Sequence, residues 1–160
     1  MTITKDEFEI STDRERLDLD FIHEFLSKEA YWSKNIPFDT VKRSADNSLN
    51  FGLFHKERAD EGIERTGGIT TGRQIGYARI ITDYSTIAYL GDVFVISAYR
   101  GKGLSKWLME QVVGHPDLQG LRRWVLLTAD AHELYKKFGW QPVAKPEWYM
   151  ERVNPNIYNT

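Results

Sequence analysis

The sequence predicts one α/β domain built on a mixed β-sheet. An apolar run over 86–96, rich in β-branched residues, is typical of a strand buried on both faces. A glycine turn and an amphipathic helix from Leu104 follow it, and a second apolar strand is expected over 123–128. Because a helix connects these two strands, they should be parallel neighbours. The strands before them follow one another without a helix, which predicts an antiparallel first half.

The start of the chain should hold a strand and two helices. These elements are expected over Phe8–Ser11, 15–30 and 38–45. Thr12 or Asp13 can cap the first helix, because their side-chain oxygens accept hydrogen bonds from free backbone amides. Pro37 suits the first turn of the second helix, where its missing N–H is not needed.

Three antiparallel strands should follow, over 50–55, 74–82 and 86–96. The connection over 56–72 is polar and rich in glycine, so we expect an exposed, mobile segment. Its length suggests either disorder or a cover for the active site.

Alternating helices and strands are expected in the last third of the chain. The helix from Leu104 should end near Gly114, and a short helix over 131–138 should end at Gly139. Short strands near 141–143 and 148–152 would then close the sheet.

Composition excludes several classes of protein. The 160 residues suit a single domain covering 1–160. The formal charge of −2 and the lack of a basic run argue against nucleic-acid binding, and no apolar stretch is long enough for a membrane span. Without cysteine there are no disulfides or thiolate metal sites, and the four histidines lack metal-site spacing, so we expect no metal and a cytoplasmic location.

The turn after the buried strand is the strongest functional signal. Gly101 and Gly103 let the backbone approach a ligand, and the helix that follows offers free N–H groups to an anion. A Walker loop needs Gly-Lys followed by Ser or Thr, which is missing, and Lys106 replaces the last glycine of a dinucleotide loop. An ordinary tight turn is the alternative without a ligand.

Two motifs together resemble the GCN5-related N-acetyltransferase (GNAT) superfamily. Tyr99-Arg100-Gly101-Lys102-Gly103-Leu104-Ser105 is similar to its acyl-CoA pyrophosphate loop, with Ala98 in place of the usual Gln or Arg. The run Ala131-His132-Glu133-Leu134-Tyr135-Lys136-Lys137-Phe138-Gly139-Trp140 is similar to its A-x-x-L-Y-x-x-x-G-F signature, with Trp140 for Phe. The resemblance implies the GNAT fold and acetyl-CoA as co-substrate.

The resemblance also implies a set of acetyl-CoA contacts. Backbone groups of Phe94 and Val95 would align the pantetheine arm, and one of their N–H groups would face the thioester oxygen. Thr128 stands where related proteins often carry Asn. The expected pyrophosphate contacts come from Arg100, Gly101, Lys102, Gly103, Leu104 and Ser105.

Tyr135 and Asp92 are the candidate catalytic residues. Tyr135 matches the tyrosine of the second motif and, with a reference pKa near 10, could protonate the leaving thiolate; the alternative is a core tyrosine. Asp92 is an acid in an apolar strand, which costs energy unless it is paired or used. It is the candidate base, directly or through water; the alternative is a structural carboxylate at a bulge, bonded to backbone or paired with Arg79.

Tyr31, Trp32 and Phe38 lie between the first two helices, where GNAT-like enzymes shape acceptor specificity. They either line the acceptor pocket or pack on the sheet.

The sequence therefore predicts an N-acetyltransferase that acts on a primary amine of a small molecule or peptide by direct attack in a ternary complex. A homodimer is compatible with this hypothesis. The alternatives are a non-catalytic acyl-CoA-binding sensor and an interaction domain without a ligand. Tyr135 favours the enzyme over the sensor.

Overall fold

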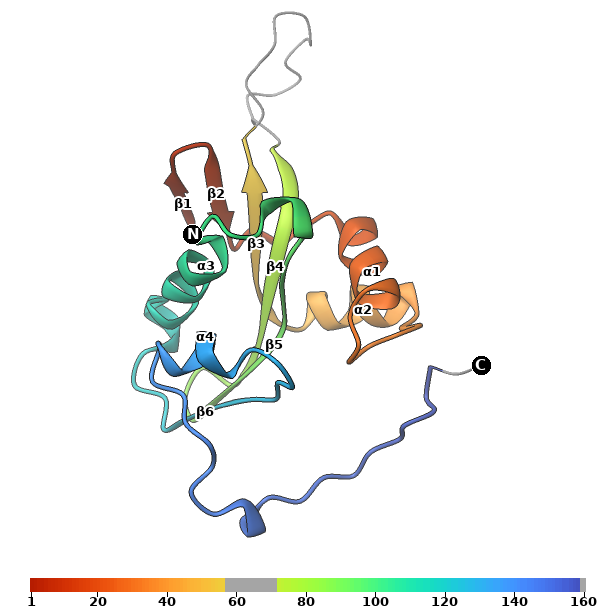
Figure 1. Ribbon diagram of the computed structural model, residues 1–160, viewed down its shortest axis with the longest axis vertical. Coiled ribbons are helices and arrows are strands. Elements are labelled where there is room, and N and C mark those ends of the chain that lie inside the picture. Colours follow the sequence, from red (N-terminus) through yellow and green to blue (C-terminus); the bar gives the residue numbers. More distant parts are fainter. Residues whose placement is uncertain (57–71, 159–160) are drawn as a thin grey trace, which may run out of the picture.

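The computed structural model describes residues 1–56 and 72–158 and shows a six-stranded sheet in the order β1-β2-β3-β4-β5-β6 (Figure 1). All neighbours are antiparallel except β5 and β6, which are parallel. This confirms the mixed α/β fold with an antiparallel first half. The strands are β1 Thr2–Lys5, β2 Phe8–Ser11, β3 Leu49–His55, β4 Arg73–Thr82, β5 Ile87–Val95 and β6 Arg123–Leu126.

Two differences concern the first half of the chain. β1 is not among the predicted strands, because its Thr-Ile-Thr-Lys sequence carries one apolar residue and it pairs only at the sheet edge. Of the connection expected over 56–72, residues 57–71 lie outside the described part of the chain.

Helices lie on both faces of the sheet (Figure 1). α1 Leu19–Lys28 and α2 Phe38–Asp46 pack around Tyr77 and Phe94 on one face. α3 Leu104–Val113 packs on the other face, where Trp107, Leu108 and Val112 are buried. The short α4, His132–Lys136, adds Tyr135 to that second core. None of the helices within residues 1–56 and 72–158 is long and apolar enough to cross a membrane.

α1 begins four residues later than the predicted helix. Asp18 caps it, because its carboxylate accepts from the Phe21 amide at 2.9 Å. Asp13 instead caps a separate 3₁₀ turn, Arg14–Arg16, through the Glu15 amide at 3.0 Å. The two acidic caps divide what the sequence pattern presents as one helix.

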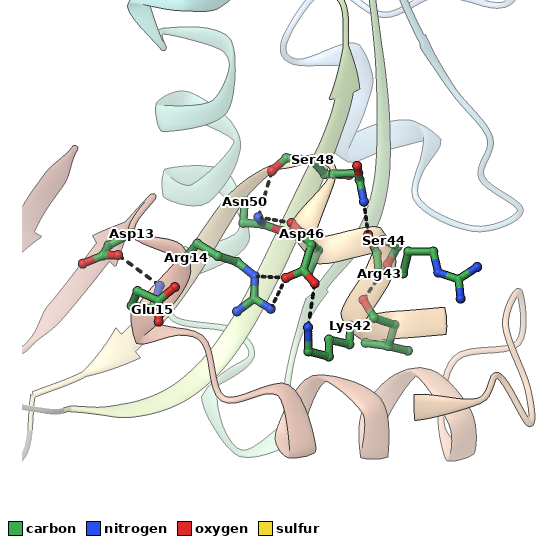
Figure 2. Close-up of polar contacts among 12 residues, drawn as sticks. Asp13, Arg14, Glu15, Lys42, Arg43, Ser44, Asp46, Ser48 and Asn50 are labelled. Atoms are coloured by element: carbon green, nitrogen blue, oxygen red, sulfur yellow. Dashed lines mark hydrogen bonds and ion pairs between the residues drawn. The ribbon is translucent and has the colours of Figure 1, made fainter. Parts of the chain in front are cut away.

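Polar contacts attach α2 to its neighbours, as Figure 2 shows. Asp46 accepts from Lys42 Nζ at 2.8 Å and from Arg14 Nε at 3.0 Å. These hydrogen bonds lower the pKa of Asp46, and the one from Lys42 has the largest effect. The buried Asn50 side chain donates to the backbone oxygens of Ala45 and Ser48, both at 2.9 Å, and accepts from the Tyr77 hydroxyl. Asn50 thus connects the end of α2 to β3 and β4.

β5 contains a bulge opposite Ala78. Tyr77 pairs with Phe94 and Arg79 with Gly91, so Asp92 and Val93 together face one residue of β4. Asp92 has a φ of 54°, a conformation in which non-glycine residues are uncommon.

The end of the chain departs from the prediction. The strands expected near 141–143 and 148–152 are wrong: the region is irregular apart from a 3₁₀ turn, Pro146–Trp148. Pro142 and Pro146 disfavour a strand here because proline cannot donate to a ladder. Residues 141–158 leave the body of the protein in an extended path (Figure 1). β6 is therefore at the edge of the sheet.

Candidate active site

The glycine loop connects β5 to α3 in the conformation that glycine permits. Gly101 and Gly103 have φ values of 79° and 75°, and Gly103 is the N-cap of α3. A Cβ atom at either position would meet nothing within 4 Å, so the backbone is open to an approaching ligand. The amides of Leu104 and Ser105 belong to the first helical turn, which has no acceptors of its own for them. The loop is thus arranged to bind an anion.

Two cationic side chains lie at this loop. Arg100 Nε donates to the Val95 carbonyl at 3.0 Å, which holds the guanidinium near the end of β5. Lys102 Nζ lies 5.4 Å from the centre of the Tyr99 ring and 5.9 Å from that of Phe8, within the range of cation–π attraction. Both positive charges would favour an anion at this loop.

β5 and β6 diverge beside the loop. Their parallel pairing ends at Leu90 and Leu126, so residues 91–95 extend beyond β6. The Val95 carbonyl accepts from Arg100, and the Ile96 amide donates to Ile75 of β4. Because successive residues of a strand direct their backbone groups to opposite edges, the Val95 N–H should point into the gap. The Phe94 side chain is buried and stacks on Phe25 of α1, with ring centres 3.8 Å apart.

Tyr135 and Thr128 lie on the β6 side of this gap. Tyr135 is 8% exposed, and burial, followed by the charges of Tyr31 and Asp130, raises its pKa to about 12. The phenol is therefore protonated at neutral pH. Thr128 Oγ1 accepts from the Ala131 amide at 3.0 Å, just before α4.

Asp92 is held between two side chains. Its Oδ2 accepts from Arg79 Nε at 2.7 Å, and its Oδ1 accepts from Trp32 Nε1 at 3.1 Å. The Asp92 side chain is 12% exposed. The Arg79 pair that the sequence allowed is therefore present, and Trp32 is an additional partner that no sequence pattern indicated.

Of the three aromatic residues predicted to shape an acceptor pocket, two lie together and the third has a different ring partner. Tyr31 and Trp32 pack edge-to-face 5.0 Å apart, and the Tyr31 hydroxyl accepts from the Ala129 amide at 2.9 Å. Phe38 instead lies edge-on to His23 at 5.6 Å. All three are exposed rather than packed into the sheet core. Tyr31 and Trp32 bridge the loop before α4 and the bulge of β5, so the segment between α1 and α2 spans the gap.

Comparison with known protein families identifies the family of this chain. Residues 19–140 match the model of the acetyltransferase (GNAT) family. The chain belongs to that family. The match includes both sequence motifs, the bulge and the segment with Tyr31 and Trp32, so it covers all of the candidate site described above.

Relatives agree with the assignment. The chain is 32% identical to "Putative acetyltransferase FG08082" of Gibberella zeae over 143 residues, 84% of this chain and 78% of that protein. It is 30% identical to "Histone acetyltransferase TAP1" of Glycine max over 132 residues, 78% of this chain but 54% of that protein. The crystal structure of a GNAT-family protein from Xanthomonas campestris pv. campestris shares 46% identity and a TM-score of 0.83, covering 96% of this chain and 97% of that chain.

A solved structure with much lower sequence identity has a similar fold. An acetyltransferase from Clostridium acetobutylicum, crystallised with acetyl-CoA, has 14% identity and a TM-score of 0.60, covering 96% of each chain. That likeness concerns the fold alone. Together the comparisons establish an acetyltransferase, in a family that uses acetyl-CoA.

Two groups at the site of this GNAT protein were not among the predicted site residues. Arg79 appeared only as an alternative partner for Asp92, yet it also donates to Ser48 Oγ at 3.2 Å. The Ala129 amide, which binds Tyr31, carries no side-chain signal. The charge of Arg79 within an apolar strand could have indicated the ion pair, because a buried charge requires a partner.

Proposed function

We propose that this acetyltransferase moves the acetyl group of acetyl-CoA to a primary amine of a small molecule or peptide. The acceptor attacks the thioester directly in a ternary complex. The observation that carries the proposal is the gap between β5 and β6, with the glycine loop at the end of β5 and a protonated Tyr135 on the β6 side. A cytoplasmic location, expected from the sequence, is part of the proposal.

Acetyl-CoA would be held mainly by backbone groups. The amides of the loop over 100–105 bind the pyrophosphate, with Arg100 and Lys102 adding positive charge. The backbone at Phe94 and Val95 aligns the pantetheine as an added strand would be aligned. The Val95 N–H is the oxyanion donor, and the Thr128 hydroxyl can donate to the pantetheine while it accepts from Ala131.

The reaction exchanges one bond for another at the acetyl carbonyl carbon. The amine nitrogen forms a bond to that carbon, and the carbon–sulfur bond breaks. Asp92, directly or through water, accepts the proton that the amine loses. Tyr135 donates to the sulfur as negative charge develops there. Tyr31 and Trp32 line the acceptor entrance, and Phe38 forms its outer part beside His23.

A consumption screen tests this function. Acetyl-CoA loss is measured with small amines, polyamines, aminoglycosides, amino acids and peptides, using Gly103→Glu as the variant with a blocked loop. We expect turnover with at least one amine class in the parent and none in the variant. A parent that binds acetyl-CoA but acetylates no amine would refute the proposal and favour an acyl-CoA sensor.

A further inference from the structure

A polar cluster lies on the face of the sheet that carries α1 and α2. Arg79 of β4 is two residues from Tyr77, which is buried against those helices, so both side chains leave the strand on the same face. Gly91 of β5 pairs with Arg79, and Tyr89 precedes Gly91 by two residues, which places the Tyr89 side chain on that face as well. Asp92 joins the cluster through its ion pair with Arg79.

The Tyr89 ring leans along β5 toward the bulge. A Cβ atom at Gly91 would lie 3.2 Å from Tyr89 Cε1, so the half-buried ring occupies the space that a side chain at 91 would need. Burial, followed by the charge of Asp92, raises the pKa of Tyr89, whereas the charge of Arg79 lowers it. The phenol is therefore protonated at neutral pH, and its hydroxyl can donate a hydrogen bond close to the ion pair.

The cluster keeps hydrogen-bonding capacity of both kinds. Arg79 Nε donates to Asp92 and Nη1 donates to Ser48. Arg79 Nη2 and the Tyr89 hydroxyl have no hydrogen-bond partner among the residues that the structure describes. The two Asp92 oxygens each accept one hydrogen bond, from Arg79 and Trp32, and a carboxylate oxygen can accept another. Donors for an anionic oxygen and acceptors for an ammonium group thus lie side by side.

An aromatic wall connects this cluster to the gap between β5 and β6. Trp32 donates to Asp92 and packs edge-to-face on Tyr31, whose hydroxyl accepts from the Ala129 amide on the other side of the gap. Both rings are exposed although their polar atoms are bonded. The rings are therefore held in place, and they offer apolar surface beside a charged pair.

We propose that the acceptor is an α-amino acid with a free carboxylate and an apolar side chain, which rests on the acetyl transfer proposed above. Its amine faces Asp92, which accepts the proton that the nitrogen loses on attack. Its carboxylate accepts from Arg79 Nη2 and the Tyr89 hydroxyl, and its side chain lies against Tyr31 and Trp32. A zwitterion matches the two charges of the cluster, whereas a polyamine would bring further positive charge toward Arg79.

Three acceptors with one carbon skeleton test the role of the carboxylate. Initial rates are measured with L-phenylalanine, L-phenylalaninamide and 2-phenylethylamine, and with the matching leucine series, at saturating acetyl-CoA. We expect kcat/KM for the amino acid to exceed that for the amine without a carboxylate at least about tenfold. Equal kcat/KM for these two would overturn the proposal. Equal kcat/KM for the amino acid and its amide would also overturn it, in favour of a peptide amino terminus.

Replacement of Tyr89 by Phe tests the contact with the carboxylate. Tyr89→Phe keeps the ring and should raise KM for the amino acid about five- to tenfold, while KM for the matched amine and the calorimetric affinity for acetyl-CoA stay within about twofold. Because each acceptor is compared with itself, differences in amine basicity cancel. Tyr84→Phe, at the exposed turn between β4 and β5, is the matched control and should change none of these values. The same rise in KM for both acceptors would make Tyr89 structural and overturn its role.

Failure of this inference and failure of the proposed function give different results. Turnover of polyamines or aminoglycosides, with no amino acid acetylated, would leave the proposed acetyl transfer standing and overturn the α-amino acid as acceptor. A parent that binds acetyl-CoA but acetylates no amine would refute the proposed function and this inference with it.

Discussion

Replacement of Tyr135 by Phe tests the proposed chemistry most directly. The substitution removes one hydroxyl and keeps the ring, which packs against Trp140 with ring centres 6.0 Å apart. The ring also keeps its place in the core around α3, so the free energy of unfolding should change little.

The size of the effect follows from the pKa of Tyr135. Burial raises it to about 12, whereas a free thiol has a reference pKa of about 8.5. Complete proton transfer to the thiolate is therefore uphill, and the hydroxyl acts mainly as a hydrogen-bond donor to the developing charge. Hydrogen bonds to charged groups contribute about 1.5–3 kcal/mol, which corresponds to a roughly 10- to 150-fold loss of kcat. We expect about 10²-fold, the lower end of general acid catalysis.

The assay compares kcat with a responsive amine and calorimetric affinity for acetyl-CoA. Affinity should stay within a few-fold of the parent, because the interaction is made mainly in the transition state. Tyr84→Phe, at an exposed turn, is the control. A raised pKa also predicts that Tyr135 adds no basic limb to the rate profile below about pH 10. Parental kcat in Tyr135→Phe would remove the residue from the mechanism.

Four further predictions concern the loop, the bulge and the core. Gly103→Glu should abolish acetyl-CoA binding in calorimetry. Gly103→Ala places a side chain at the same positive φ without the bulk or charge of Glu, and it should retain most of the affinity. Equal losses of affinity in the two variants would mean that backbone strain causes the effect. Asp92→Asn should lower kcat, because the candidate base is lost, and it should lower the unfolding midpoint, because Arg79 loses its ion-pair partner. Parental kcat in a folded variant would make Asp92 structural. Asn50→Ala leaves the Tyr77 hydroxyl and two backbone oxygens without their partner. Chemical denaturation should therefore show a free energy of unfolding that is lower by about 2–5 kcal/mol. A decrease below about 1 kcal/mol would contradict this role of Asn50. Burial lowers the folded-state pKa of His115 below 6.5, so its contribution to stability is complete above pH 6.5 and decreases as pH falls. His115→Gln should therefore make the melting temperature fall less steeply as the pH is lowered. The same dependence of melting temperature on pH in parent and variant would show that His115 is not the cause.

Local patterns predicted the elements that make the candidate site. The β-branched run, the glycine pair and the following apolar stripe each have a physical reason to form strand, turn and helix, and β5, the loop and α3 appear there. The crossover rule predicted that β6 lies parallel to β5.

Tertiary contacts explain what local patterns missed. Trp32 and Asp92 are 60 residues apart in the sequence, and only the packing of α1 and α2 on the sheet brings them together. Residues near 148–152 have strand-like composition, but a strand also needs a neighbour.

The bulge in β5 changes which residues of the strand face each side of the sheet, and this change shapes the candidate site. Before it, even-numbered residues Ala88 and Leu90 face the core around α3; after it, odd-numbered Val93 and Val95 do. Without the extra residue, strict alternation would direct Asp92 into that apolar core, where an unpaired carboxylate costs several kcal/mol. The bulge instead directs Asp92 toward Arg79 and Trp32. The bulge also determines toward which edge of β5 the Val95 N–H points. One inserted residue therefore sets the position of both the candidate base and the candidate oxyanion donor, and this accounts for an aspartate at positive φ in the middle of a buried strand.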